Sequence, residues 1–359
     1  MLRNVKRAPG ATRGMSREPG KDRPTSFDIA QLAGVSQPTV SRALSGNPSV
    51  SEATRKRIEA IARQLNYTVD KNASSLRRRE TKTLALLFFE DPTPDQSMIN
   101  PFFLSMLGSL TRTCALRGYD LLTSFQQLSS DWHVDYEDSR RADGIILLGY
   151  GDFEEYRTRL DQLVAQGTHF VRWGSPQPGA AGTVIGCDNI GSGAAAAEHL
   201  IALGRRRIGF IGQANSHYPE FCDRYRGACQ AQRAAGLMPD PALQVDALNT
   251  QAAGHAAVHE LVRRRVDLDA LFCASDTLAI GALAALEELG LTVPGDVAMI
   301  GFDDIPAASL THPPLTTIAQ NYQLAGETLV DTLLRLIHGE AVASVTLPGK
   351  LVVRRSTRG

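Results

Sequence analysis

Residues 25–67 read TSFDIAQLAGVSQPTVSRALSGNPSVSEATRKRIEAIARQLNY and contain three helical patterns in succession. Thr25 is the expected N-cap of the first helix, with Asp28 three residues on in the acidic position of a capping box. Gly34 ends this helix at a position that tolerates positive φ. Its predicted apolar stripe consists of Phe27, Ile29, Ala30, Leu32 and Ala33.

The second helix is predicted over Gln37–Leu44, with Ser36 as its N-cap and Pro38 in a first turn that needs no N–H partner. Two helices joined by a Gly-containing turn of about four residues are typical of the helix-turn-helix motif. The third helix begins at Ser51, and the residues that it is expected to turn inward are Ile58, Ile61, Ala62 and Leu65.

The second helix is the expected DNA reader. Val40, Ala43 and Leu44 lie on its inward side, whereas the outward side carries short hydrogen-bonding groups and one guanidinium, which suit base edges and phosphates. The outward residues are Gln37, Thr39, Ser41 and Arg42. The alternative is a small helical unit with a merely solvated polar face; spacing, caps and polarity together favour entry into the major groove.

The chain of 359 residues is too long for one ordinary domain and hydrophobic enough, at 43%, for large cores. Its formal net charge of zero arises because a basic N-terminal part is balanced by an acidic remainder. Residues 1–80 hold 16 Lys and Arg against 7 Asp and Glu, and the remainder holds 22 against 31. A basic front and an acidic body favour a nucleic-acid-binding module joined to a domain that stays off DNA.

The five cysteines are scattered and contain no CxxC pair, so neither a zinc site nor a disulfide framework is predicted. No apolar run approaches the roughly 20 residues that cross a bilayer, and the N-terminus lacks the apolar core of an export signal. We therefore expect a cytoplasmic protein. Residues 1–24 are basic and rich in Gly and Pro, which predicts disorder; either Met1 or Met15 could be the native start.

Beyond residue 82 the pattern alternates between short apolar runs and helical stretches, which predicts parallel sheets covered by helices on both faces, an α/β class. In such sheets ligands bind at the carboxyl ends of the strands. The expected strands are 83–89, 119–125, 144–150, 168–174, 207–212, 270–275 and 297–302, and the expected helices are 103–118, 156–167, 192–204, 225–236, 253–265 and 277–290.

The segment AGVSQPTVSRALSGNPSVSEATRKRIEAIARQLNY closely resembles the headpiece of the lac-repressor/galactose-repressor (LacI/GalR) family of bacterial transcription regulators. The resemblance covers about residues 25–356 and continues through NPFF (100–103), RGYDLL (117–122), ADGIIL (142–147) and DNIGSG (188–193). It implies an N-terminal helix-turn-helix headpiece and two doubly wound parallel-sheet subdomains, similar to periplasmic sugar-binding proteins.

The domain boundaries follow from pattern and resemblance together. We expect a tail at 1–24, a helix-turn-helix domain at 25–69, a hinge helix or linker at 70–81 and an effector-binding core at 82–359. Within the core, the N-subdomain is expected at about 82–187 and 316–344, and the C-subdomain at about 188–315 and 345–359.

The resemblance implies that the hinge folds on DNA, pairs with that of a dimer mate and inserts Leu76 into the minor groove, with Ala73 where the paired helices touch. Asp70 and Pro38 depart from the family pattern, so Asp70 is repelled by phosphate and Pro38 leaves fewer base contacts. The DNA-binding residues predicted in all are Thr25, Ser36, Gln37, Pro38, Thr39, Ser41, Arg42, Asn47, Ala73 and Leu76.

The resemblance also implies effector-binding residues. Arg224 matches an arginine that grips the effector, and Asp303 matches a carboxylate that accepts from effector hydroxyls. Asp276 is a further candidate, although it could equally cap the following helix. Phe103 and Trp173 match aromatic positions that line the cleft, and Trp173 is expected to be exposed to it.

Three departures leave the effector open. Arg172 stands where some relatives carry an acid, which reverses the local charge preference. Asn249 stands where several relatives place a stacking aromatic, and residues 126–144 break up a family helix. Arg172 and Asn249 are nevertheless expected to line the site.

We interpret the chain as a sequence-specific transcription regulator, most often a repressor in this family, that binds palindromic operator DNA as a homodimer. The expected effector is a sugar held between the two core subdomains, and whether it induces or co-represses stays open. The alternatives are a purine- or nucleoside-responsive regulator of the same family, a sugar-binding transport component or an enzyme on a similar core. No cofactor is expected. His255 and His259 share a helical face, but without an evident third ligand we expect no metal.

Overall fold

The computed structural model describes residues 24–67, 80–91, 97–149, 151–179 and 181–358. The chain divides into two compact units, Met1–Arg79 and Glu80–Gly359. The predicted tail through residue 23 and the hinge positions Ala73 and Leu76 lie outside the described residues. The described helices are all too short or too polar to cross a lipid bilayer.

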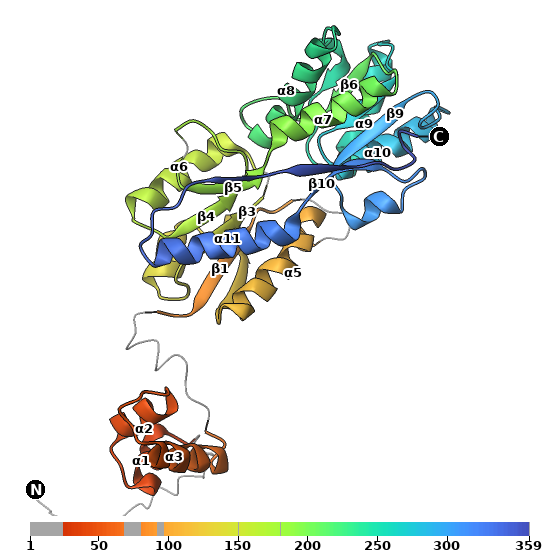
Figure 1. The fold of residues 1–359 in the computed structure, drawn as a ribbon. Helices are drawn as coiled ribbons and strands as arrows, with labels where there is room; N and C mark the ends of the chain where they lie inside the picture. The colour runs from red at the N-terminus through yellow and green to blue at the C-terminus, as the bar shows by residue number, and fades with distance from the viewer. Residues whose placement is uncertain (1–23, 68–79, 92–96, 150, 180, 359) are drawn as a thin grey trace, which may run out of the picture. The chain divides into compact units, whose positions relative to one another are not determined.

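The headpiece has the three helices that the sequence predicts: α1 (Ser26–Ala33), α2 (Gln37–Leu44) and α3 (Glu52–Gln64) (Figure 1). The capping box is present, since Thr25 N donates to Asp28 Oδ2 at 2.7 Å and Asp28 N donates to Thr25 Oγ1 at 3.4 Å. The hydrogen bond from the Thr25 backbone N–H lowers the pKa of Asp28, and the Thr25 hydroxyl, which donates to Asp28 Oδ2 at 2.7 Å, lowers it further. Gly34 ends α1 with a φ of 63°.

The small core of the headpiece draws residues from all three helices and the loop before α3. Phe27 and Leu32 are not part of it, being 71% and 63% exposed, so the predicted α1 stripe was too wide. A helix advances about 100° per residue, which turns positions two residues away from the buried Ile29 and Ala30 toward the opposite side. The buried residues are Ile29, Ala30, Ala33, Val40, Ala43, Val50, Ile58 and Ala62.

The first sheet of the core has the strand order β11-β5-β4-β3-β1-β2, with all neighbours parallel. Successive residues of β1 face opposite sides, Leu84 and Leu86 toward α5 and Ala85 and Leu87 toward α6. The strands are β1 (Thr83–Phe88), β2 (Asp120–Phe125), β3 (Ile145–Leu148), β4 (Phe170–Trp173), β5 (Thr183–Cys187) and β11 (Val345–Leu347).

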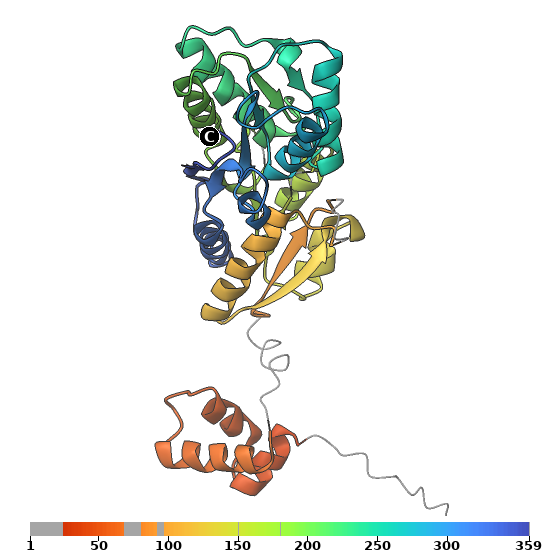
Figure 2. The same cartoon turned by 90° about the vertical axis from the view of Figure 1, so that its right-hand side faces the viewer.

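The helices of this lobe cover both faces of the sheet. In both views α11 lies alongside α5, although the two are far apart in sequence (Figures 1 and 2). A short 3₁₀ turn and a π turn replace a regular helix in the 126–144 stretch. These elements are α5 (Pro101–Leu116), η1 (Gln126–Leu128), η2 (His133–Asp138), α6 (Phe153–Ala165) and α11 (Tyr322–Ile337).

The second sheet has the order β12-β10-β9-β8-β6-β7, and only β12 is antiparallel to its neighbour. Its strands are β6 (Ile208–Ile211), β7 (Gln244–Val245), β8 (Ala270–Cys273), β9 (Ala298–Asp303), β10 (Thr316–Gln320) and β12 (Gly349–Val352). Its helices are α7 (Asn189–Ala202), α8 (Pro219–Ala234), η3 (Pro241–Leu243), α9 (Gln251–Arg263), α10 (Asp276–Glu288) and η4 (Pro306–Ser309).

Every strand and helix predicted for the core is present, but the predicted subdomain boundaries place two segments wrongly. β10, assigned to the N-subdomain, pairs with β9 in the second sheet, and β11, assigned to the C-subdomain, pairs with β5 in the first. The chain therefore crosses between lobes after β5, after β10 and after β11. A short strand next to a lobe crossing has too few residues for its hydrophobic pattern to show which of the two sheets it joins.

Candidate DNA-reading surface and effector cleft

The surface of α2 presents the polar groups that the sequence predicts. Arg42 and Pro38 are exposed, Gln37, Thr39 and Ser41 are partly exposed, and Val40 and Ala43 are buried beneath them. Because the apolar side holds α2 against its neighbours, the helix is fixed with its short donors and acceptors facing out. This arrangement is suited to insertion into the major groove.

The remaining predicted DNA-contact residues of the headpiece lie beside this helix. Gln37 Nε2 donates to Ser26 Oγ at 3.1 Å, which ties the start of α2 to the start of α1 near Thr25. Ser36 is the N-cap residue of α2, although its Oγ pairs with Thr39 Oγ1 at 2.9 Å rather than with a backbone N–H. Asn47 is exposed and accepts from Ser49 N at 2.9 Å.

Among the described residues of the core, both lobes border a larger and a smaller cavity. The larger has a volume of about 540 Å³, within the usual range for a small-molecule site. The smaller, at about 40 Å³, has room for little more than a water molecule. The larger cavity is lined by Asp91, Asn100, Pro101, Leu104 and Ser105 of the N-lobe and by Asn249, Thr250, Gln251, Ala252, Thr277, Ile280, Ile305, Pro306 and Ala307 of the C-lobe.

Two polar atoms in the wall of the larger cavity lack a hydrogen-bond partner among the described residues: Asp91 Oδ2 and Asn249 Nδ2. Burial raises the pKa of Asp91 to about 7. Asn249 is oriented by its other amide atom, Oδ1, which accepts from Ser275 Oγ at 2.5 Å. One carboxyl oxygen from the N-lobe and one amide N–H group from the C-lobe thus remain unsatisfied beneath the cavity wall, and a ligand would reach them only after the side chains rotate.

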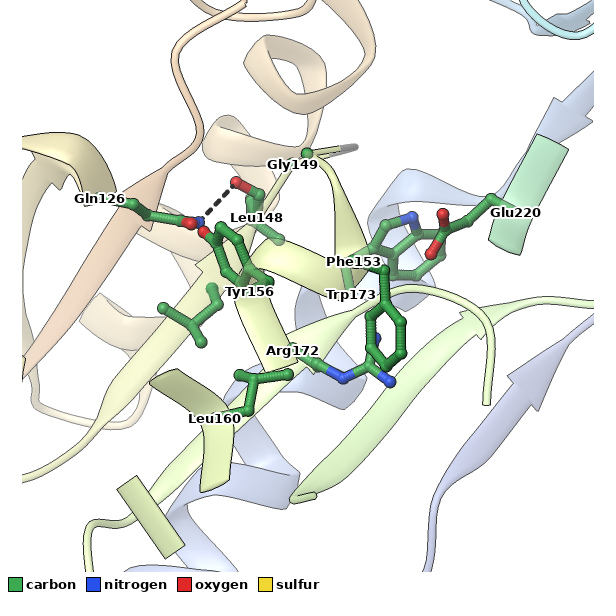
Figure 3. A pocket seen from close by; sticks show the side chains of 11 residues that line it. Gln126, Leu148, Gly149, Phe153, Tyr156, Leu160, Arg172, Trp173 and Glu220 are labelled. Carbon is green, nitrogen blue, oxygen red and sulfur yellow. Dashed lines mark hydrogen bonds between the residues drawn. The ribbon is translucent and has the colours of Figure 1, made fainter. Parts of the chain in front are cut away.

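The smaller cavity lies where Arg172 and Trp173 end β4, and Glu220 approaches it from α8 of the other lobe (Figure 3). Burial lowers the pKa of Arg172, opposed by the negative charge of Glu220. Burial likewise raises the pKa of Glu220, opposed by a hydrogen bond from Ser175 N at 2.9 Å and by Arg172. Trp173 is only 4% exposed and packs on Phe102, so the expected open aromatic face is absent.

Arg224 of α8 is fully buried, and its contacts lie within the C-lobe. Its Nε donates to Asn189 Oδ1 at 2.9 Å, its Nη1 donates to Ala274 O, and Asp303 Oδ1 lies 3.9 Å from Nη1. The guanidinium also stacks on the ring of Phe302, 3.6 Å from its centroid. The structure thus brings Arg224 and Asp303 of the predicted effector site together, in a buried polar network of the C-lobe.

Asp276 and Phe103 occupy buried positions. The N-cap of α10 is Ser275, so capping by Asp276 was the wrong alternative. Asp276 instead accepts from Ile305 N at 2.9 Å and Thr317 Oγ1 at 2.6 Å, and burial, with the nearby Asp303 carboxylate, raises its pKa well above its usual range. Phe103 is 1% exposed and packs edge-on against Phe102.

Direct contacts join the lobes beside the smaller cavity. His217, which precedes α8, places Nδ1 2.8 Å from the carboxylate of Asp152 in the N-lobe. Phe153 N donates to His217 O at 2.8 Å. Asn189 Nδ2 donates to Ser175 Oγ at 2.8 Å. Relative movement of the two lobes would break or remake these bonds.

Sequence reasoning missed Asp91 and Glu220 as cleft residues. Asp91 follows an apolar strand, which is a usable signal because ligands gather at the carboxyl ends of parallel strands. Glu220 sits in the first turn of α8 and carries no local signal for its burial. Its role depends on Arg172 from the other lobe, which no spacing rule relates to it.

Comparison with known proteins agrees with this geometry. Residues 27–70 match the model for bacterial regulatory proteins of the lacI family, and residues 197–357 match a periplasmic binding protein-like domain. The transcriptional regulator CelR of Thermobifida fusca is 32% identical over 340 residues, which cover 93% of this chain and 98% of CelR. The chain belongs to the lacI family.

Other lacI-family relatives align over the same length. The transcriptional repressor CytR of Escherichia coli K12 is 32% identical over 93% of this chain and 96% of CytR. Among solved structures, a complex of CelR with cellobiose has a TM-score of 0.69 at 31% identity, covering 93% of this chain and all of that one. The lac repressor dimer bound to operator has the same fold, with a TM-score of 0.80 at 24% identity.

Membership of the lacI family makes the chain a DNA-binding transcriptional regulator. The alternatives of an enzyme or a transport component on a similar core are thereby set aside. The described residues contain a helix-turn-helix headpiece and a core with a cavity bordered by both lobes.

Proposed function

We propose that this regulator is a repressor that binds a palindromic operator as a homodimer, with one α2 helix in the major groove of each half-site. Arg42 and Gln37 would contact bases and phosphates from α2, supported by Ser36, Pro38, Thr39 and Ser41. Thr25 and Asn47 would contact the backbone at either side. Half-sites would lie about one helical turn apart.

The hinge proposal rests on family resemblance, because residues 70–79 lie outside the described residues. Leu76 would open a base step in the minor groove, and Ala73 would let paired hinges approach. The bacterial cytoplasm, at the nucleoid, is the proposed location. Leu76→Ala should lower operator affinity more than affinity for random DNA, because a wedge acts only where the duplex can kink. Equal losses would contradict the wedge.

We further propose that the effector is a sugar bound in the larger cavity. The observation that carries this is a cavity of about 540 Å³ lined from opposite lobes by Asp91 and Asn249, each of which has a buried polar atom, Asp91 Oδ2 or Asn249 Nδ2, without a hydrogen-bond partner among the described residues. Hydroxyl groups both donate and accept, so one sugar ring could satisfy both atoms and draw the lobes together.

The relatives leave a second candidate, because one structure holds cellobiose while other relatives are the repressors CytR and PurR. A purine or nucleoside would profit from an aromatic ring to stack on. The residues that line the larger cavity include no Phe, Tyr or Trp in the described part of the chain, and Asn249 stands in the wall instead. This favours a sugar over a purine.

The remaining predicted effector residues would act behind this first layer. Arg224, Asp303 and Asp276 would form the polar floor that a deeper effector group reaches when the lobes part. Arg172, with Glu220, would set the charge at the inner end of the cleft beside Trp173. Phe103 would keep the N-lobe wall in place.

Effector binding would control DNA affinity by biasing the relative orientation of the lobes. The contacts that change are those between His217 and Asp152 and between Glu220 and Ser175. A coupling free energy of about 1–3 kcal/mol, or 5–150-fold in operator affinity, is typical of such a device.

A thermal-shift screen of the full chain against sugars, sugar phosphates, nucleosides and purines tests the effector class. We expect a sugar to raise the melting temperature and Asn249→Leu to weaken its binding at least tenfold. Arg226→Ala, an exposed change on α8, is the control and should bind the sugar normally. A purine that binds while sugars do not would overturn the sugar proposal.

A further inference from the structure

A cluster of two histidines and one glutamate lies on the C-lobe, on helices that Figure 1 shows side by side. His255 and His259 are one turn apart on α9, and Glu288 is the last residue of α10. His255 Nε2 lies 2.9 Å and His259 Nε2 3.8 Å from the same oxygen, Glu288 Oε2. The carboxylate supplies the third ligand that the spacing of the histidines alone did not reveal.

We propose that this cluster is a binding site for a divalent transition-metal ion of the Zn²⁺ type. The three candidate ligand atoms all lie within 4.8 Å of one another. Tetrahedral Zn²⁺, with bonds of about 2.0–2.2 Å to nitrogen and oxygen, needs its ligands roughly 3.3 Å apart. Small side-chain rotations therefore bring the three atoms into coordination, and water fills the fourth position.

The close packing of α9 and α10 makes the cluster possible. A Cβ on Gly254 would overlap the carbonyl oxygen of Leu278, and a Cβ on Gly281 would overlap that of Gln251. Glycine at both positions lets the two helices approach more closely than other residues allow. The imidazoles of α9 can then reach a carboxylate on α10.

The chemistry of the donors selects the ion. Two neutral imidazoles and one carboxylate suit Zn²⁺, Ni²⁺ and Cu²⁺, whereas Mg²⁺ and Ca²⁺ prefer an all-oxygen set. The imidazole rings already lie close together, with centroids 4.8 Å apart and ring planes tilted by 46°. The cation one turn beyond them, Arg263, is neutralised by Glu260 at 2.8 Å, which limits repulsion of a bound metal ion.

The location links the site to the larger cavity. The first residues of α9, including Gln251, and Thr277 and Ile280 of α10 line that cavity. A metal ion that joins the two helices would hold this wall together. Its immediate effect is on the stability of the C-lobe and does not depend on which effector binds.

The test is isothermal titration of Zn²⁺ into the full chain after removal of metals with a chelator. We expect saturable binding at one site per chain. His259→Ala and Glu288→Gln should each weaken it at least tenfold; the Gln variant keeps a hydrogen-bonding group beside His255 but loses the carboxylate. His338→Ala removes another exposed histidine and should change nothing.

Thermal unfolding gives a second readout. Zn²⁺ should raise the melting temperature of the parent chain and not that of His259→Ala, while Mg²⁺ should raise neither. Zn²⁺ affinity within twofold of the parent value in both His259→Ala and Glu288→Gln would overturn the site. Absence of saturable Zn²⁺ binding to the parent chain would overturn it as well.

Discussion

The headpiece and the core cleft build their sites in opposite ways. The headpiece displays short polar side chains outward from α2, and everything that holds that helix lies within the 43 residues from Thr25 to Tyr67. The cleft is assembled from residues scattered over the core, and its polar groups are mostly buried. A surface reader can be specified locally, whereas a binding cleft depends on how strands cross between two lobes.

The substitution with the largest expected effect should unfold the headpiece and leave the core unchanged. Ile29→Asp places an unpaired charge in the small headpiece core, where Ile29 has no exposed surface. That cost, about 5 kcal/mol or more, should unfold the headpiece and abolish operator binding. The stability of the core should be the same as in the parent chain, and the fluorescence of Trp132 and Trp173 during urea unfolding measures it.

The neighbouring Phe27→Asp is the matched control, because Phe27 lies on the same helix but is 71% exposed. It should leave the headpiece folded by far-UV circular dichroism. Operator binding by the Ile29→Asp variant at parent affinity would contradict the role of the headpiece core, and a changed unfolding transition of the core would contradict the separation of the two units.

A slightly smaller effect is expected in the cleft. Arg224→Ala leaves Asp303 without its buried cation and should destabilise the core by about 3–5 kcal/mol in urea unfolding followed by tryptophan fluorescence. The response of operator binding to effector should also disappear. Arg226→Ala, which removes a half-exposed pair with Asp223, should cost at most about 1 kcal/mol. Equal losses in the two variants would contradict the buried network.

Asp91 predicts a pH dependence confined to the core. Its pKa is raised from 3.8 to about 7, so the folded chain keeps a proton that the unfolded chain has lost. The associated stability is therefore complete below about pH 4 and is lost as the pH rises through 7. Between pH 5 and pH 8 the parent should lose about 3 kcal/mol relative to Asp91→Asn in urea unfolding. If the unfolding free energies of the parent and of Asp91→Asn change equally with pH, the raised pKa of Asp91 is contradicted.

The smallest expected loss of stability is for a substitution in the headpiece. Ser51 Oγ accepts from Thr54 N at 3.3 Å and caps α3, so Ser51→Ala should lower the stability of the headpiece by about 1 kcal/mol. Thermal unfolding of the headpiece by circular dichroism measures this. Ser49→Ala, where the contact with Asn47 uses the backbone N–H, should cost less than half as much.

The difference between a locally specified headpiece and a core assembled from distant segments explains which features could be predicted from the sequence. The cap Thr25, the start of α3 at Ser51, the left-handed Gly34 and the buried side of α2 are local signals, and the structure confirms them to within a residue. In the core, long apolar runs predicted β1, β2, β3, β4, β6, β8 and β9 correctly, whereas the remaining strands, β5, β7, β10, β11 and β12, were not predicted. The subdomain assignment of β10 and β11 failed because strand pairing is a tertiary choice that short segments do not record.

The cleft shows the same limit. The match to the family pointed to Arg224 and Asp303, which the structure does bring together. Asp91 and Asn249 meet one cavity from distant parts of the chain, and no spacing rule joins them. Trp173 was expected to face the cleft, but it packs on Phe102 instead, since exposure depends on neighbours that only the folded lobes supply.

The central claim is that a ligand in the cleft controls the headpiece. Its most direct test is the operator affinity of the full chain, measured by fluorescence anisotropy with and without a saturating ligand from the thermal-shift screen, for the parent chain and Asn249→Leu. We predict a 5–150-fold change in the parent chain, matched by the reciprocal change in ligand affinity on adding operator, and a reduced effect in the variant. Operator affinity that is the same with and without saturating ligand in the parent chain would contradict the account.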